Sequence, residues 1–232
     1  MTTVVLVRHG LTHMTGPVLA GWTPGLHLDE RGKAQAAAVA DRLRPLPLDA
    51  VISSPLDRCL DTADALLSGR ELELQVDDRL GECRYGDWTG RPLKELAKDP
   101  LWKVVQAHPS AVVFPGPEGE ALRDTQARAV SAVRDWNSRL GADATWLACS
   151  HGDVIKSVVA DALGLHLDQF QRIAIDPCSV TVIRYTELRP FVLRVNDTGG
   201  GVADLLPPKR KGRRRASSDA AVGGGAGAAD PV

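Results

Sequence analysis

The chain has 232 residues, of which 44% are hydrophobic and 25% are charged, and its formal net charge is −1. This length and composition suit one globular α/β domain with a full hydrophobic core. No apolar run approaches the roughly 20 residues that span a bilayer, and the first residues lack the basic and apolar regions of a signal peptide. We therefore expect a cytoplasmic protein with no membrane partner.

The four cysteines are widely spaced and form no CxxC pair. This spacing argues against structural zinc or a disulfide framework, and it favours reduced thiols. No cluster of His, Cys and carboxylate residues has the spacing of metal ligands, so we expect neither a metal nor another cofactor.

The charges are distributed unevenly along the chain. Six of the 28 basic residues and two of the 29 acidic residues lie beyond Leu206, so residues 1–206 carry a net charge of −5 and the remainder carries +4. The acidic balance of the first part argues against a general nucleic-acid surface. After Asn196 the composition turns to Gly, Ala, Pro, Arg and Ser, which cannot bury enough apolar surface to fold.

These observations predict a domain over residues 1–196 and a disordered, basic and Gly/Ala-rich tail over residues 197–232. The basic run 209–215 leaves nucleic acid as a less favoured partner, because it has no aromatic residue for base stacking and no amphipathic period. We expect truncation after Asn196 or Val202 to leave folding intact and activity within about twofold.

Strand and helix patterns alternate along the chain. Apolar runs predict strands, periodic segments predict helices, and an antiparallel pair closes the domain. In chain order, the expected elements are a strand at 3–7, a helix at 29–43, a strand at 51–55, a helix ending at 67, a strand at 71–76, a helix at 121–140, a strand at 144–149, a helix at 154–163, and strands at 179–185 and 189–195. This order predicts an α/β fold with three α/β/α layers and a mostly parallel central sheet.

Polar residues follow three of the predicted strands. Arg8 and His9 follow the first strand, Arg58 begins the helix after the second, and His151 follows the strand that ends at Cys149. The carboxyl ends of parallel strands and the first turns of helices are where α/β sheets bind anionic ligands. Gly10 is expected to let the main chain approach such a ligand.

Together these segments resemble the histidine phosphatase superfamily, also called the phosphoglycerate mutase-like superfamily, over roughly residues 4–185. The stretch Arg8–Thr12 is similar to its RHG signature, and further blocks follow in the family's order. They are residues 28–32, 53–63, 81–90 and 150–152. The resemblance implies the superfamily's fold and a phosphohydrolase that needs no metal.

The resemblance also implies roles for individual residues. His9 would be the nucleophile that forms a phosphohistidine, and Glu82 would be the general acid and base. His151 would act in catalysis and, with Arg8, Arg58 and Thr12, would bind the phosphoryl oxygens. The residues expected to influence substrate specificity are Thr15, Gly21, Trp22, Arg84 and Tyr85.

Two branches of the superfamily share this centre. The residues 85–90 and 114–120 resemble the FGxWEG and PGGES segments of the phosphatase branch, and no Arg-Arg pair occurs between Arg91 and His151. We therefore expect a phosphatase acting on a small phosphorylated metabolite. A phosphoglycerate mutase-type phosphomutase and a phosphate-binding module without turnover are the alternatives. The substrate and the oligomeric state, a homo-oligomer included, stay open.

Overall fold

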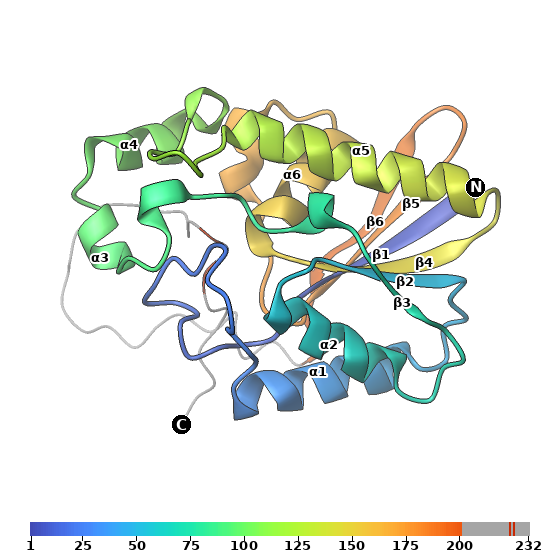
Figure 1. The fold of residues 1–232 in the computed structure, drawn as a ribbon. Helices are drawn as coiled ribbons and strands as arrows, with labels where there is room; N and C mark the ends of the chain where they lie inside the picture. The colour runs from blue at the N-terminus through green and yellow to red at the C-terminus, as the bar shows by residue number, and fades with distance from the viewer. Residues whose placement is uncertain (201–222, 224, 226–232) are drawn as a thin grey trace.

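The computed structural model describes residues 1–200, Gly223 and Gly225. The predicted tail at 201–222, 224 and 226–232 lies outside the described residues. In the described part, a six-stranded sheet has helices on both faces (Figure 1). The strands are β1 (Thr2–Arg8), β2 (Ala50–Ser53), β3 (Leu74–Val76), β4 (Thr145–Ser150), β5 (Val180–Tyr185) and β6 (Pro190–Asp197). The α-helices are α1 (Glu30–Leu43), α2 (Asp57–Leu67), α3 (Leu93–Leu96), α4 (Pro100–Ala107), α5 (Leu122–Leu140) and α6 (Gly152–Ala162).

The strand order is β3-β2-β4-β1-β5-β6. The first four strands in this order pair in parallel, whereas β5 runs antiparallel to both β1 and β6. The predicted three-layer fold with a mostly parallel sheet is therefore confirmed, as is the antiparallel pair at its end. Within the described part, every helix is too short or too polar to cross a membrane.

Alternating side chains of the strands fill two separate cores. In β1, Val4 and Leu6 join the core beneath α5 and α6, while Val5 and Val7 join the core beneath α1 and α2. This alternation follows from the pleat of a strand, which points successive side chains to opposite faces. A strand that is buried on both faces must be apolar throughout, as this segment is.

The segment between β3 and α5 contains helices that the sequence patterns did not predict. Helix α4 begins with Pro100 after Asp99, whose side chain accepts a hydrogen bond from the backbone N–H of Leu101. Its buried Trp102 packs against the fully buried Trp88, which also contacts Phe114 edge to face. This aromatic cluster joins the segment to the core beneath α5 and α6.

The sheet brings the three polar strand ends together. Arg8 pairs with Ser150 in the parallel register of β1 and β4, and Ser53 of β2 pairs with Cys149 of β4. The backbone N–H of His9 also donates to the carbonyl of Ser150 at 3.0 Å. The residues after β1, β2 and β4 therefore share one edge of the sheet, where α/β folds bind ligands.

Gly10 lies close against the first turn of α1. A Cβ atom at Gly10 would lie 2.6 Å from the carbonyl oxygen of Gly32 in the first turn of α1. The missing side chains of Gly10 and Gly32 thus allow the strand end and the helix to approach closely. Asp29 caps this same turn by accepting from the N–H of Gly32 at 2.8 Å.

Candidate active site

The His9 ring is oriented by its own loop. Its Nδ1 atom lies 2.7 Å from the carbonyl oxygen of Gly10. A carbonyl can only accept a hydrogen bond, so Nδ1 carries the proton and Nε2 carries the lone pair. Arg58 Nε donates to this Nε2 atom at 3.2 Å. Burial, with the charges of Arg58 and Arg8, holds the pKa of His9 well below its ordinary value. A neutral imidazole whose lone pair is directed into the pocket is suited to nucleophilic attack.

His151 lies beside His9, with the two ring centroids 5.2 Å apart. Arg58 Nη2 donates to Nδ1 of His151 at 3.2 Å, so the proton of this ring is on Nε2 and is donated to Ser54 Oγ at 2.7 Å. Burial and the positive charges of Arg58 and Arg8 hold the pKa of His151 well below its ordinary value. Both imidazoles are therefore neutral.

Two buried guanidinium groups supply positive charge to this site. Arg58 enters from the first turn of α2, and its Nη2 atom also donates to the carbonyl of Gly21 at 2.7 Å. Its Nη1 atom is buried and has no hydrogen-bond partner among the described residues. Arg8 donates through Nη1 to the carbonyl of Ile175 at 2.7 Å. Guanidinium groups are well matched to phosphoryl oxygens, and Arg58 Nη1 is the donor available for one.

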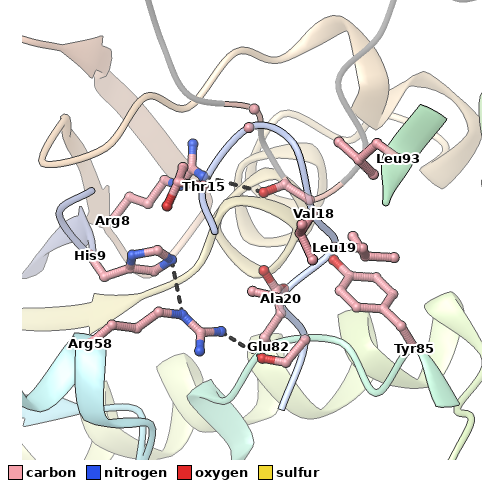
Figure 2. Close-up of a pocket in the computed structure, with 14 residues that line it drawn as sticks. Arg8, His9, Thr15, Val18, Leu19, Ala20, Arg58, Glu82, Tyr85 and Leu93 are labelled. Carbon is pink, nitrogen blue, oxygen red and sulfur yellow. Dashed lines mark hydrogen bonds between the residues drawn. The ribbon is translucent and has the colours of Figure 1, made fainter. Parts of the chain in front are cut away.

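Glu82 lies in the loop after β3 and lines the same pocket as His9 (Figure 2). Its side chain is buried, and one carboxyl oxygen accepts from the N–H of Cys83 at 2.9 Å. Burial, together with the negative charge of Asp153, raises the pKa of the Glu82 carboxyl to about 7, against the opposing effect of Arg58 and Arg8. A carboxyl group with this pKa can both donate and accept a proton near neutral pH.

A small pocket with a cavity of about 30 Å³ is lined by Arg8, His9, Arg58 and Glu82 (Figure 2). Among the residues predicted to set specificity, Thr15, Gly21 and Tyr85 line it. Its remaining wall is mainly apolar and was not anticipated from the sequence, because isolated aliphatic residues carry no distinguishing signal. The residues of that wall are Val18, Leu19, Ala20 and Leu93.

Four of the predicted site residues, His151 among them, do not line this pocket. Thr12 is buried and forms a 2.9 Å hydrogen bond between its Oγ1 and that of Thr15. Trp22 donates from Nε1 to the carbonyl of Glu82 at 2.6 Å, and the Arg84 guanidinium lies over the Trp22 ring at 3.9 Å. Thr12 thus supports Thr15, while Trp22 supports the backbone of Glu82.

Asp153, in the first turn of α6, is a site residue that the sequence patterns did not identify. It is buried, and its Oδ2 atom accepts from the hydroxyl of Tyr85 at 2.8 Å. Lys156 Nζ lies 3.5 Å from its other oxygen. The available signal was its position directly after Ser150-His151-Gly152. A charged residue in the first turn of a helix that begins beside a site alters the pKa values of the groups there.

Two residues of the predicted tail also line the pocket. The carbonyl of Gly223 accepts from Arg8 Nη2 at 3.3 Å, and its N–H donates to Asp153 Oδ2 at 3.2 Å. Gly225 is the second. Among the described residues, no three His, Cys, Asp or Glu side chains are grouped to hold a metal ion.

The carboxyl edge of the sheet thus gathers two histidines and two arginines in one buried site. Residues 4–198 match the Histidine phosphatase superfamily (branch 1). The chain belongs to this family, as its motifs predicted.

Known proteins named as a phosphatase and as a phosphoglycerate mutase resemble the chain. Phosphoserine phosphatase 1 of Hydrogenobacter thermophilus is 31% identical over 209 residues, which cover 85% of this chain and 93% of that protein. A probable phosphoglycerate mutase GpmB of Cronobacter sakazakii is 29% identical over 216 residues, covering 90% and 97%. The solved structure of Bacillus stearothermophilus YhfR superposes with a TM-score of 0.77 at 29% identity, covering 85% of this chain and 98% of that one.

Proposed function

We propose that the protein hydrolyses small phosphate monoesters in two displacements, with His9 as the nucleophile and Glu82 as the general acid and base. The observation that carries this proposal is the orientation of His9. Its Nδ1–H is fixed on the Gly10 carbonyl, and its Nε2 lone pair faces the pocket beside Arg58. An imidazole held in this tautomer can attack phosphorus without first losing a proton.

In the first displacement, Nε2 of His9 bonds to phosphorus and the ester P–O bond breaks. Glu82 donates its proton to the departing oxygen, which leaves as an alcohol. The carbonyl of Gly10 stabilises the positive charge that develops on the ring, because it already accepts from Nδ1. Arg8 and Arg58 bind the phosphoryl oxygens and offset the charge of the transition state, while His151 accepts from Arg58 Nη2 and helps to orient it.

In the second displacement, water attacks the phosphohistidine and the ionised Glu82 takes its proton. The N–P bond breaks, inorganic phosphate leaves, and His9 recovers its neutral form. A pKa near 7 suits both halves of this cycle, because Glu82 must be protonated in one and ionised in the other.

The small pocket and its apolar wall favour compact substrates. We include phosphoserine and 3-phosphoglycerate among the candidates, because the names of the two relatives point to them. Thr15 and Tyr85 are the polar side chains of the wall that would contact the part of the substrate beyond the phosphate. Release of inorganic phosphate from a panel of such esters by purified protein identifies the preferred substrate.

A phosphomutase is the second candidate, favoured by the similarity to the probable phosphoglycerate mutase. A mutase returns the phosphoryl group to a second hydroxyl, whereas a phosphatase transfers it to water. Incubation with 3-phosphoglycerate and a bisphosphoglycerate primer separates the two activities. Release of inorganic phosphate without formation of 2-phosphoglycerate supports the phosphatase, and the opposite result supports the mutase.

The role of Glu82 is tested with Glu82→Gln and a series of esters. A missing proton donor matters most when the departing oxygen is strongly basic, so alkyl phosphates should lose far more kcat/KM than aryl phosphates. Equal losses along the series would exclude Glu82 as the acid.

A further inference from the structure

Arg128 of α5 is hydrogen-bonded through all five of its N–H donors. Nη1 donates to the carbonyls of Arg79 and Gly81, both at 2.7 Å, and Nη2 donates to the carbonyl of Glu82 at 2.9 Å. The remaining two donors, on Nη2 and Nε, reach the two carboxyl oxygens of Glu120 at 2.6 and 3.2 Å. A guanidinium group has five N–H bonds, so none is left for a substrate.

Three of these five hydrogen bonds end on the main chain that carries Glu82. The carbonyl of Glu82 also accepts from Trp22 Nε1 at 2.6 Å, so both of its lone pairs are used. The loop that presents the Glu82 carboxyl is thus attached to α5 on one side and to the Trp22 loop on the other. Loops without such contacts are mobile, and catalytic groups must be held within about 0.5 Å of their working position.

Glu120 fixes Arg128 in place. Its carboxyl oxygens form a bidentate pair with Arg128, and one of them also accepts from Thr125 Oγ1 at 2.6 Å and from the N–H of Arg84 at 2.9 Å. Although burial alone would raise it, these hydrogen bonds and the Arg128 charge keep the pKa of Glu120 below its ordinary value. The pair therefore stays ionised, and it is mostly buried. Removing one partner of such a pair leaves the other charge unpaired.

We propose that Arg128, oriented by Glu120, is a positioning residue for the general acid Glu82. This inference rests on the proposed function of Glu82. Arg128 does not line the pocket, so it acts through the backbone of residues 79–82 rather than on the substrate.

Arg128→Lys tests the proposal, because lysine keeps the charge but has three donors in a different geometry. We expect kcat/KM to fall about tenfold for alkyl phosphates and no more than about twofold for an aryl phosphate with an acidic phenol, since only the former depend on proton donation. Arg134→Lys is the matched control. Arg134 lies on the same helix, is exposed, and pairs with Asp161 away from the pocket. It should leave both substrates unchanged.

A double-mutant cycle separates positioning from general structural damage. If Arg128 acts through Glu82, Arg128→Lys should have little further effect in a Glu82→Gln background. Losses that are equal for both esters, or that are additive with Glu82→Gln, would overturn the positioning role. If Glu82→Gln alone lacks the dependence on leaving group, the acid assignment fails, and the positioning role fails with it.

Glu120→Gln provides a second variant if Arg128→Lys does not fold, which circular dichroism and thermal unfolding will show. Glutamine retains one acceptor but loses the second hydrogen bond to Arg128. The same selective loss on alkyl phosphates, smaller than for Arg128→Lys, is expected. An unselective loss in a folded Glu120→Gln protein would contradict the proposal.

Discussion

Arg58 Nε lies 3.2 Å from Nε2 of His9, the nitrogen with the lone pair. The same guanidinium reaches Nδ1 of His151 through Nη2, also at 3.2 Å. One buried side chain therefore orients both imidazoles, and its positive charge helps to keep them neutral. The group proposed to bind the phosphoryl oxygens is also the group that sets the direction of the attacking nitrogen.

The pH dependence of activity should follow the ionisation of Glu82. Its pKa is about 7, so kcat/KM for alkyl phosphates should decline above neutral pH as the acid form is lost. Asp153 is one of the groups that raise this pKa, so Asp153→Asn should move the decline to lower pH. Asp161→Asn, at the far end of the same helix, serves as the control. A profile that is unchanged or shifted upward in Asp153→Asn would contradict this electrostatic account.

The free energy of unfolding should also depend on the ionisation of Glu82. Because the pKa of Glu82 is raised on folding, its protonated form favours the folded state at low pH, and this contribution is lost as the pH rises through about 7. Glu82→Gln stays neutral at every pH, so at pH 8 it should unfold with a free energy roughly 1–3 kcal/mol above that of the wild type. The difference should vanish near pH 4.5. Urea unfolding at both pH values measures it, and a variant less stable at pH 8 would contradict the assigned pKa.

Chelators are expected to leave activity unchanged. Arg8 and Arg58 already place two positive charges at the site, which is the role that magnesium has in many phosphoryl-transfer enzymes. The measurement is kcat/KM before and after dialysis against EDTA. Loss of activity that returns with added magnesium or zinc would contradict a metal-independent mechanism.

Truncation after Gly200 should act mainly on KM. It removes Gly223, whose carbonyl accepts from Arg8 and whose N–H donates to Asp153. The carbonyl of Gly223 competes with a phosphoryl oxygen for the Arg8 donor. Because such a hydrogen bond contributes about 1 kcal/mol, its removal should lower KM roughly fivefold. We expect kcat to stay within about twofold, because His9 and Glu82 are held by residues of the domain. A higher KM, or a large loss of kcat, would show instead that the segment contributes to catalysis.

Much of the fold could be predicted from sequence because its strands are short apolar runs and its longer helices are amphipathic. β1 and β4 are buried on both faces, and α5 ends at Gly141, as expected. Helix α4 was missed because its eight residues, which begin with Pro100, show less than three turns of periodicity. A pattern of this length does not distinguish a helix from a loop.

The centre of the site was predicted residue by residue, but its supports were not. Arg8, His9, Arg58, Glu82 and His151 are brought together by the sheet. Arg128 and Asp153 lie on amphipathic helices, where a charged residue usually faces solvent. Their burial depends on which loop packs above each helix, and this tertiary arrangement has no local sequence signal.

The covalent role of His9 is the central claim of this account, and rapid acid-free quenching of a labelled reaction tests it most directly. Wild-type protein mixed with a ³²P-labelled ester should carry label that is lost in acid and stable in alkali, as expected of phosphohistidine, and His9→Ala should carry none. Turnover by His9→Ala should fall by at least about three orders of magnitude, equivalent to roughly 4 kcal/mol of barrier. Label on the His9→Ala protein, or activity within about tenfold of wild type, would contradict the mechanism.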